Sequence, residues 1–284
     1  MIYVLSFRDE SRNRGGPVLG GRLRRLDPAG VTEGIPARDA LAVEQRVIFL
    51  VHGFNVSLRD GEETLREFAA LLRSHRDVGL VVTLWPGDHW VGAASYPFEG
   101  RDADDTAFEL ARFIGDTLAP KTPISFVSHS LGGRVVFGAM SRLSGEYPVE
   151  QVCVMAAAVD DFSLAEADDY RSAVERSERV GVLSSKKDRV LRFAYPAGDL
   201  LESFFFFWRE QSGLALGYHG PRSARGAPVP ANVVHEAIPE SRKVDHGDYL
   251  PTDPPSDQQQ LAKWRAAAIF ADQVLAGCEE PDYP

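Results

Sequence analysis

Residues 123–138 read PISFVSHSLGGRVVFG and contain the motif S-x-S-x-G, with Ser130 at its centre. Apolar and small residues before the motif are typical of a buried strand, and the Gly-Gly pair after it is typical of a helix start. A sharp turn between a strand and a helix strains the serine backbone and presents its hydroxyl above the sheet. The residues two positions before and after the serine must then be small, as Ser128 and Gly132 are.

We therefore predict that Ser130 is a catalytic nucleophile. It would stand at the N-terminus of a helix, where the positive end of the helix dipole favours a developing anion. His129 lies between the two serines of the motif, and its backbone position points it away from Ser130. We expect His129 to line the site or to have a structural role.

The rest of the chain alternates apolar runs with helical patterns, which predicts a mainly parallel sheet with helices on both faces. The expected strands are 2–7 (an edge strand), 46–51, 80–85, 124–128, 152–159, 180–184 and 232–238. The expected helices are 57 to about 75, 102–118, 132–143 and 256–275, with loops at 9–40 and 86–100. No repeat or linker is visible, so we expect one domain over residues 1–284, whose first 43 residues form a strand and a loop.

A second informative segment is RVIFLVHGFN at residues 46–55, which has the form of a buried strand ending at His52-Gly53. A tetrahedral oxyanion needs two backbone N–H donors, one from the residue after the nucleophile, here Leu131, and one from a loop after an earlier strand. Gly53 lets the backbone turn closely, so we expect the N–H of Phe54 to be the second donor. We expect His52 to hold this loop rather than to act as a base.

Three stretches together carry a resemblance to a known group of proteins. They are RVIFLVHGFNVS at 46–57, Trp85-Pro86 after the next strand, and SHSLGG at 128–133. They resemble the α/β-hydrolase superfamily, and within it a bacterial branch of uncharacterised members with an HGFN oxyanion segment. The resemblance covers roughly residues 44–250. It implies the α/β-hydrolase fold, Ser130 as nucleophile, Phe54 and Leu131 as oxyanion donors, an acid after a later strand and a histidine near the end.

The chain order in this fold is nucleophile, acid, histidine. Asp188 follows the expected strand 180–184, and its surroundings SKKDRV resemble the acid loop of the superfamily. We predict Asp188 as the acid. Asp160 and Asp161, after the expected strand 152–159, are the alternatives, although a helix cap or a strand-end turn explains them as well.

The base must come from the histidines that follow the acid, which are His219, His235 and His246. His235 lies inside an apolar strand pattern and His219 precedes that strand. His246, in VDHGDYL, follows the last strand in a polar loop with Gly247. We predict that His246 takes the proton of Ser130 and later protonates the leaving group, with Asp188 holding its tautomer.

Composition narrows the function classes. The net charge of −10 disfavours binding to nucleic acid, and we interpret the locally basic residues 8–25 as a solvated loop rather than a site for an anionic partner. No apolar run is long enough to span a membrane and no leader pattern is visible. With only Cys153 and Cys278, we expect a cytoplasmic protein. The scattered histidines form no metal motif, and we expect no metal and no cofactor.

The substrate pocket is expected at the carboxyl ends of the strands. Trp90, Tyr96 and Phe98 in the loop 86–100 could form one wall, with ordinary loop packing as the alternative. Within the segment 197–230, residues 199–217, which include FFFFW at 204–208, could be a lid, an acyl-binding wall or an interface in a homodimer. A plain core helix is the more ordinary interpretation, but four consecutive phenylalanines cannot all face one side.

These observations predict a hydrolase that cleaves a small-molecule carboxylic ester through an acyl-enzyme intermediate. A lipase, a thioesterase or an acyltransferase would use the same residues with a different pocket or acceptor. A binding protein that has kept the fold and lost turnover is the alternative from another class. All four catalytic elements occur in the expected order, which argues against that alternative.

Overall fold

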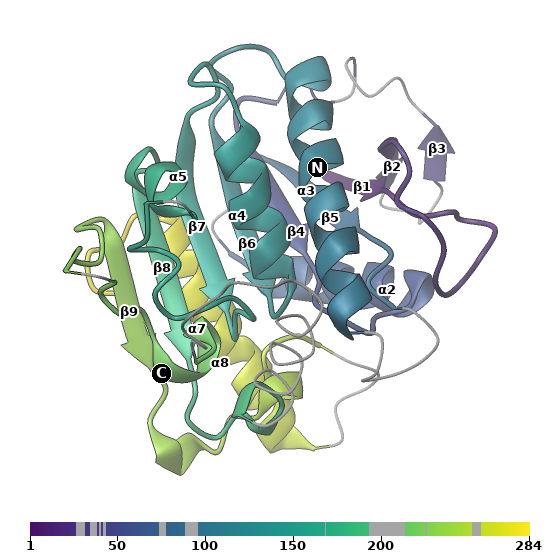
Figure 1. The fold of residues 1–284 in the computed structure, drawn as a ribbon. Helices are drawn as coiled ribbons and strands as arrows, with labels where there is room; N and C mark the ends of the chain where they lie inside the picture. Colours follow the sequence, from purple (N-terminus) through teal and green to yellow (C-terminus); the bar gives the residue numbers. More distant parts are fainter. Residues whose placement is uncertain are drawn as a thin grey trace.

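A central β-sheet organises the molecule in the computed structural model (Figure 1). The structure describes residues 1–26, 32–34, 39, 41, 44–73, 78–88, 96–167, 169–192, 214–224, 226–251 and 257–284. Within these residues the sheet has nine strands in the order β3-β2-β1-β5-β4-β6-β7-β8-β9. The strands are β1 (Ile2–Ser6), β2 (Arg22–Leu26), β3 (Thr32–Gly34), β4 (Val47–Val51), β5 (Gly79–Leu84), β6 (Ile124–His129), β7 (Val149–Met155), β8 (Arg179–Ser184) and β9 (Val233–Ala237).

Seven neighbouring strands, from β1 through β9 in the sheet order, are parallel, and β2 pairs antiparallel with both β1 and β3. The central strands are apolar along their whole length because helices cover both faces. Strand β4 (VIFLV) and strand β5 (GLVVTL) are buried at every position. The expected α/β-hydrolase fold, a mainly parallel sheet with helices on both faces, is confirmed.

The described helices form two layers. They are α2 (Leu58–Leu71), α3 (Tyr96–Thr117), α4 (Gly132–Arg142), α5 (Arg171–Glu175), α7 (Leu216–His219) and α8 (Gln258–Leu275), with the 3₁₀ turns η2 (Glu240–Arg242) and η3 (His246–Asp248). Helices α3, α4 and α5 lie side by side on one face of the sheet, and α2 and α8 cover the other (Figure 1). Ser57 and Asp257 cap the N-termini of α2 and α8 with their side chains, as is typical of those residue types.

The strand order reverses between β4 and β6. From β4 the chain crosses to β5 on one side and then returns to β6 on the other, with Val47 to Val51 in register with Ile124 to Ser128. In open parallel sheets such a switch point leaves a crevice at the carboxyl ends of the two strands, because the connections leave in opposite directions. Strand β4 delivers His52 and Gly53 to this point, and β6 delivers Ser130.

Some predictions for the N-terminal third were wrong. Strand β1 is not an edge strand, because it lies between β2 and β5. Residues 9–40 are not all loop, since β2 pairs with β1 from Ile2↔Leu26 to Ser6↔Arg22. The sequence RLRRL of β2 does not resemble a strand: Arg22 is exposed, Arg24 and Arg25 are half-buried, and only Leu23 and Leu26 are buried.

Two boundaries also differ from the expectation. Helix α3 begins at Tyr96, inside the expected loop 86–100, because a proline at position 97 is tolerated in the first turn of a helix. Strand β7 ends at Met155 rather than at residue 159, because Ala156 has a φ of 48° and turns the chain out of the extended conformation. Trp90 and most of the segment 197–230, including FFFFW, lie outside the described residues.

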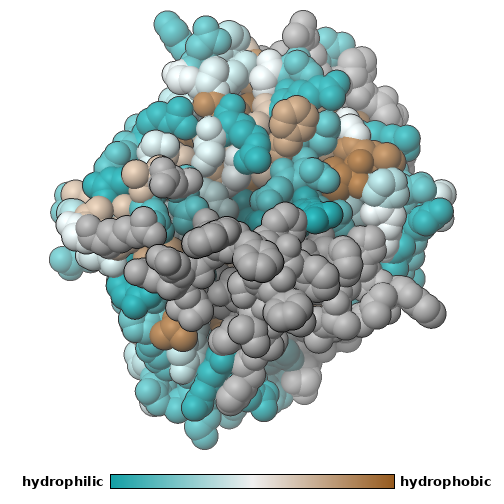
Figure 2. Space-filling view, in the orientation of Figure 1, coloured by the Kyte–Doolittle hydropathy of each residue, from teal (hydrophilic) through white to brown (hydrophobic). Residues whose placement is uncertain are grey.

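Among the coloured residues of Figure 2, polar side chains predominate outside a few apolar spots, and the large exposed apolar residues of the described part are Met1, Phe108, Val190 and Leu214. Cys153 is buried in β7, Cys278 is exposed, and both are free thiols. Among the described helices, none is long and apolar enough to cross a membrane.

Candidate active site

Ser130 stands on a strained turn between β6 and α4. Its φ of 56° places a non-glycine residue in the left-handed region, which is uncommon and costs free energy. Three backbone hydrogen bonds hold this conformation: the Ser130 N–H donates to Met155 O, and its carbonyl accepts from the N–H groups of Gly133 and Ala158. The turn therefore has the geometry of a nucleophile elbow.

Glycines are required where the elbow meets the neighbouring strand. A Cβ on Gly132 would lie 2.5 Å from the carbonyl oxygen of His52, which is too close for any other residue type. This contact explains why the second small position of the motif is a glycine. The first small position, Ser128, is buried in β6, and its Oγ would lie 3.9 Å from a Cβ on Gly133 of α4.

The structure brings Ser130, His246 and Asp188 together. The Ser130 Oγ lies 2.9 Å from Nε2 of His246. The other ring nitrogen, Nδ1, lies 2.7 Å from Oδ2 of Asp188. Asp188 is fully buried after β8, and its second oxygen accepts the N–H of Leu191. The three predicted side chains thus form one continuous hydrogen-bonded chain.

The hydrogen bonds determine the tautomer of His246. An ionised carboxylate can only accept, so Nδ1 carries the proton that it donates to Asp188. In the neutral ring Nε2 is then the acceptor for the Ser130 hydroxyl. Its lone pair therefore points at the one proton that must leave Ser130 for this oxygen to attack a carbonyl.

The turn η3, which carries His246, is anchored to the acid loop and to α8. The Ser185 hydroxyl donates to Val244 O over 2.6 Å. Asp245 caps η3 and accepts two hydrogen bonds from Arg189, one residue after the acid. Lys263 of α8 forms an ion pair with Asp248 at 2.7 Å, and these contacts fix η3 above the sheet.

His52 supports the loop that follows β4. Its Nε2 accepts the N–H of Trp85, its Nδ1 donates to Gly53 O, and its ring stacks on the indole. Burial lowers the pKa of His52 to about 3, so the ring is neutral, as one acceptor and one donor nitrogen require. The structural role expected for His52 matches these contacts.

The same loop contains Phe54, which is partly buried against the core, and Asn55, whose φ of 57° turns the chain. The Asn55 N–H donates to Gly87 O, which joins the loop to the end of β5. Leu131 directly precedes the first residue of α4, where backbone N–H groups have no partner within the helix. Leu131 follows Ser130 in the chain, and Phe54 follows Gly53, whose added Cβ would lie 2.7 Å from the Ser130 Cβ.

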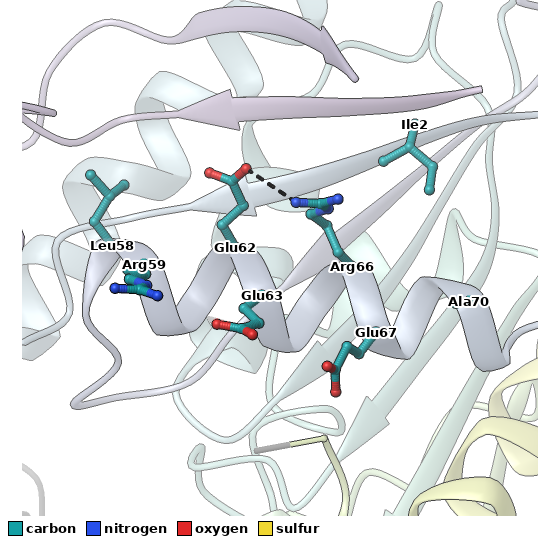
Figure 3. A pocket seen from close by; sticks show the side chains of 8 residues that line it. All are labelled: Ile2, Leu58, Arg59, Glu62, Glu63, Arg66, Glu67 and Ala70. Atoms are coloured by element: carbon teal, nitrogen blue, oxygen red, sulfur yellow. Dashed lines mark ion pairs between the residues drawn. The ribbon is translucent and has the colours of Figure 1, made fainter. Parts of the chain in front are cut away.

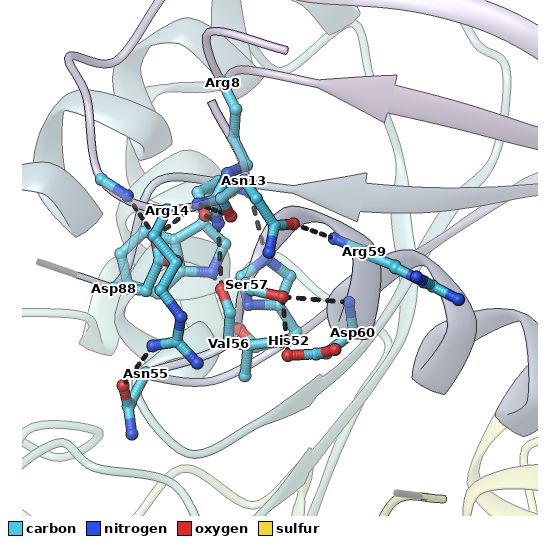
Figure 4. Close-up of polar contacts among 12 residues, drawn as sticks. Arg8, Asn13, Arg14, His52, Asn55, Val56, Ser57, Arg59, Asp60 and Asp88 are labelled. Carbon is cyan, nitrogen blue, oxygen red and sulfur yellow. Dashed lines mark hydrogen bonds and ion pairs between the residues drawn. The ribbon is translucent and has the colours of Figure 1, made fainter. Parts of the chain in front are cut away.

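A buried ion pair that sequence analysis missed lies behind this loop (Figure 4). Arg8 and Asp88 are both fully buried and in contact. The Arg8 guanidinium also donates to the carbonyls of Val56 and Trp85, at 2.9 and 3.0 Å. Burial raises the pKa of Asp88, and the Arg8 charge opposes this shift. The only sequence signal was a charged residue directly after the apolar run of β1.

Segment 13–15 belongs to the same cluster. The Asn13 carbonyl accepts the N–H of Leu58 and a hydrogen bond from Arg8, and the Gly15 N–H donates to Asp88. Arg14 donates to the Asn55 side chain at 3.2 Å (Figure 4). The interpretation of residues 8–25 as a solvated loop was therefore wrong for Arg8, whose charge is neutralised inside the fold.

The alternative acids and bases have other partners. Buried Asp161 pairs with Arg222 at 2.9 Å and with His219 at 3.3 Å. His235 makes a 2.8 Å hydrogen bond with Ser184. Asp160 pairs with Ala215 in an isolated backbone bridge. The carboxylate that contacts His246 is that of Asp188.

Little in the described part of the chain tests the predicted substrate pocket. Tyr96 and Phe98 lie in the first turn of α3. A surface pocket beside α2, lined by Ile2 and by seven helix residues between Leu58 and Ala70, contains the Glu62–Arg66 ion pair and none of the three candidate residues (Figure 3). No cluster of His, Cys, Asp and Glu among the described residues could hold a metal ion.

A mainly parallel sheet with a strained serine turn at the end of a central strand defines an α/β hydrolase. The family match is consistent with this class. The chain belongs to the family described as alpha/beta hydrolase of unknown function (DUF900), whose model matches residues 37–197. The matched region contains Ser130 and Asp188, while Arg8 and His246 lie outside it.

Several solved structures are similar at low sequence identity. A poly(3-hydroxybutyrate) depolymerase, LpqC, from Bordetella parapertussis is 17% identical, over 95% of this chain and 93% of that one, with a TM-score of 0.43. The esterase PE8 is 14% identical, over 84% and 96%, with a TM-score of 0.40. A hyperthermophilic esterase from the archaeon Pyrobaculum calidifontis is 14% identical, over 90% and 83%, with a TM-score of 0.39. No curated protein matches the chain.

Proposed function

We propose that the protein is a serine hydrolase that cleaves a small carboxylic ester through an acyl-enzyme intermediate. The observation that carries the proposal is the chain of two hydrogen bonds from Ser130 Oγ through His246 to Asp188, 2.9 and 2.7 Å long. A serine hydroxyl is a weak nucleophile until an adjacent base takes its proton, and the base needs a third group to orient it. All three parts are in hydrogen-bond contact here.

In the first half of the reaction, Ser130 Oγ attacks the ester carbonyl while its proton moves to Nε2 of His246. The backbone N–H groups of Leu131 and Phe54 would hold the negative oxygen of the tetrahedral intermediate. Asp188 stabilises the imidazolium that forms. His246 then protonates the leaving oxygen as the carbon–oxygen bond of the ester breaks. The alcohol leaves, and the acyl group stays bound to Ser130.

In the second half, water replaces the alcohol. His246 takes a proton from water, the hydroxide attacks the acyl carbonyl, and the carboxylic acid leaves as Ser130 recovers its proton. The reaction consumes one water and requires no metal or cofactor in this proposal. A homodimer and a cytoplasmic location stay predictions, as does the wall formed by Trp90, Tyr96 and Phe98.

Labelling with a fluorophosphonate probe tests the nucleophile, because the probe reacts with an activated serine. We expect the wild type and a Ser141→Ala control to be labelled, since the Ser141 hydroxyl only donates to Phe137 O in α4. We expect Ser130→Ala to remain unlabelled. Equal labelling of the Ser130→Ala variant would reject Ser130 as the nucleophile.

A panel of p-nitrophenyl esters with short and long acyl chains, together with thioesters and amides, tests the substrate class. Release from short esters supports the proposal, and a preference for long chains would indicate a lipase. Faster turnover of thioesters, or acyl transfer to an added alcohol, would move the assignment to those activities on the same three residues. Labelling without turnover of any substrate would contradict ester hydrolysis.

A further inference from the structure

His129, the residue before the candidate nucleophile, makes a contact that catalysis as described above does not use. Its Nε2 lies 2.9 Å from the backbone carbonyl oxygen of His246. The two imidazole rings lie 4.8 Å apart between centroids, and the ring of Tyr249 lies 5.6 Å from His129 on the same turn. The His129 side chain is directed at the turn η3, which carries the candidate base.

The chemistry of this hydrogen bond fixes the state of His129. A carbonyl oxygen only accepts, so the His129 Nε2 must carry a proton. Burial, reinforced by the neighbouring His246, holds the pKa of His129 well below its ordinary range. His129 is therefore a neutral donor. A neutral donor holds the carbonyl without adding a second positive charge when His246 becomes protonated.

His129 also contacts the opposite side of the site. A Cβ on Gly53 would lie 3.1 Å from the His129 Nδ1 and 3.2 Å from its carbonyl oxygen. The imidazole thus lies between the loop after β4 and the turn η3. The ring therefore lies close to both segments that must be placed relative to Ser130, and it belongs to the residue next to Ser130 in the chain.

We propose that His129 is a positioning residue that sets the distance between Ser130 and His246. The inference rests on the proposed function. The contacts of η3 with Ser185, Arg189 and Lys263 tie it to the acid loop and to α8. The His129 hydrogen bond connects η3 to β6, the strand that directly precedes the nucleophile. This hydrogen bond therefore sets the distance over which the Ser130 proton moves to Nε2 of His246.

Two substitutions at one position separate this role from simple packing. His129→Phe keeps a flat ring against Tyr249 and removes the donor. His129→Gln removes the ring but retains an N–H that can reach the His246 carbonyl. His235→Gln is the control for replacing a histidine elsewhere in the sheet, since the His235 ring lies in β9 and is hydrogen-bonded to Ser184.

We expect His129→Phe to lower kcat on a p-nitrophenyl ester by about 10- to 100-fold, because a displacement of roughly 1 Å has an effect of this size. KM should change by less than about twofold, and phosphonate labelling should slow in parallel with kcat. His129→Gln should recover most of the loss. Rates are compared well below each variant's melting temperature, so that a loss of folded protein does not enter.

The outcomes distinguish this inference from the proposed function. Absence of turnover and labelling in the wild type would reject the proposed function, and with it the basis for the positioning role. An active wild type, an inactive Ser130→Ala and a His129→Phe variant with wild-type kcat would reject the positioning role alone. Equal losses in His129→Phe and His129→Gln would also reject it, because the hydrogen bond would then not be the cause.

Discussion

Gly53 packs against Ser130 so closely that a methyl group on Gly53 would lie 2.7 Å from the Ser130 Cβ. Such a separation does not occur between real side chains, so Gly53→Ala must push the loop after β4 away from the nucleophile. We expect kcat to fall by about 100-fold or more, the size associated with losing one oxyanion donor. Kinetics on a p-nitrophenyl ester measure this effect.

The control for Gly53→Ala is Gly115→Ala, in α3, where an added Cβ meets nothing within 4 Å. Alanine replaces glycine there in a helix interior, which stabilises a protein by about 0.5–1 kcal/mol. Gly115→Ala should therefore keep its kcat and unfold at a slightly higher denaturant concentration. A normal kcat in Gly53→Ala would show that the close approach has no role in the reaction.

Asp188→Asn should reduce kcat by about 10³- to 10⁴-fold, because an amide can donate to Nδ1 of His246 and favour the wrong tautomer. Asp161→Asn is the comparison, since Asp161 is a buried aspartate paired with Arg222 and His219. We expect that variant to lose stability but keep its kcat. The assignment of the acid would be overturned if Asp188→Asn retained full activity.

The stability of the protein should fall as the pH is lowered from about 6.5 towards 3. The pKa of His52 is about 3 in the fold against an ordinary value of 6.5. Between these two pH values His52 binds a proton in the unfolded chain but not in the folded chain. Its contribution to the free energy of unfolding is therefore complete above pH 6.5 and is lost as the pH falls. The loss from this group is about 1.4 kcal/mol per pH unit.

Denaturant unfolding of wild type and His52→Gln at several pH values isolates this effect. Glutamine offers one acceptor for Trp85 and one donor for Gly53, and it does not titrate. The variant should be less stable at pH 7 and should lose stability less steeply below pH 6.5. Some slope should remain, since the pKa of His129 and that of His235 are also lowered by burial. Identical slopes would contradict the buried neutral state of His52.

Breaking the Arg8–Asp88 pair should be costly. Removing one partner leaves an unpaired charge in the interior, which typically costs about 3–5 kcal/mol. We therefore expect Arg8→Met to lower the free energy of unfolding by about that amount. Asp88→Asn should lower it too, and the double variant should lose clearly less than the sum of the two. Urea midpoints measure the cycle, and strict additivity would mean that the two charges do not interact.

The central strands and the nucleophile turn could be predicted from the sequence because each has a local signature. Apolar runs identify β4 to β8, and the small residues around Ser130 follow from the steric demands of a tight turn. Long-range partners leave weaker signals. Arg8 finds its partner 80 residues away, and its neighbours in the chain reveal only that it follows an apolar strand.

The choice among acids illustrates the same limit. Asp160, Asp161 and Asp188 all follow apolar strands, and a single sequence cannot show which of these carboxylates faces the histidine. The later strand and the resemblance of SKKDRV to the acid loop of the superfamily favoured Asp188, and the fold places it within 2.7 Å of His246. Strand β2 was missed because two leucines among three arginines do not resemble a buried strand.

The 116 residues that separate Ser130 from His246 have a consequence for the protein during its synthesis. At about 5–20 residues per second, a ribosome needs roughly 6–23 s to travel from one to the other. A growing chain that has already exposed its serine elbow therefore still lacks the imidazole, and it should be inert towards esters and phosphonates alike. The chain would therefore become reactive in a single late step, when β9 and the turn η3 dock onto the sheet.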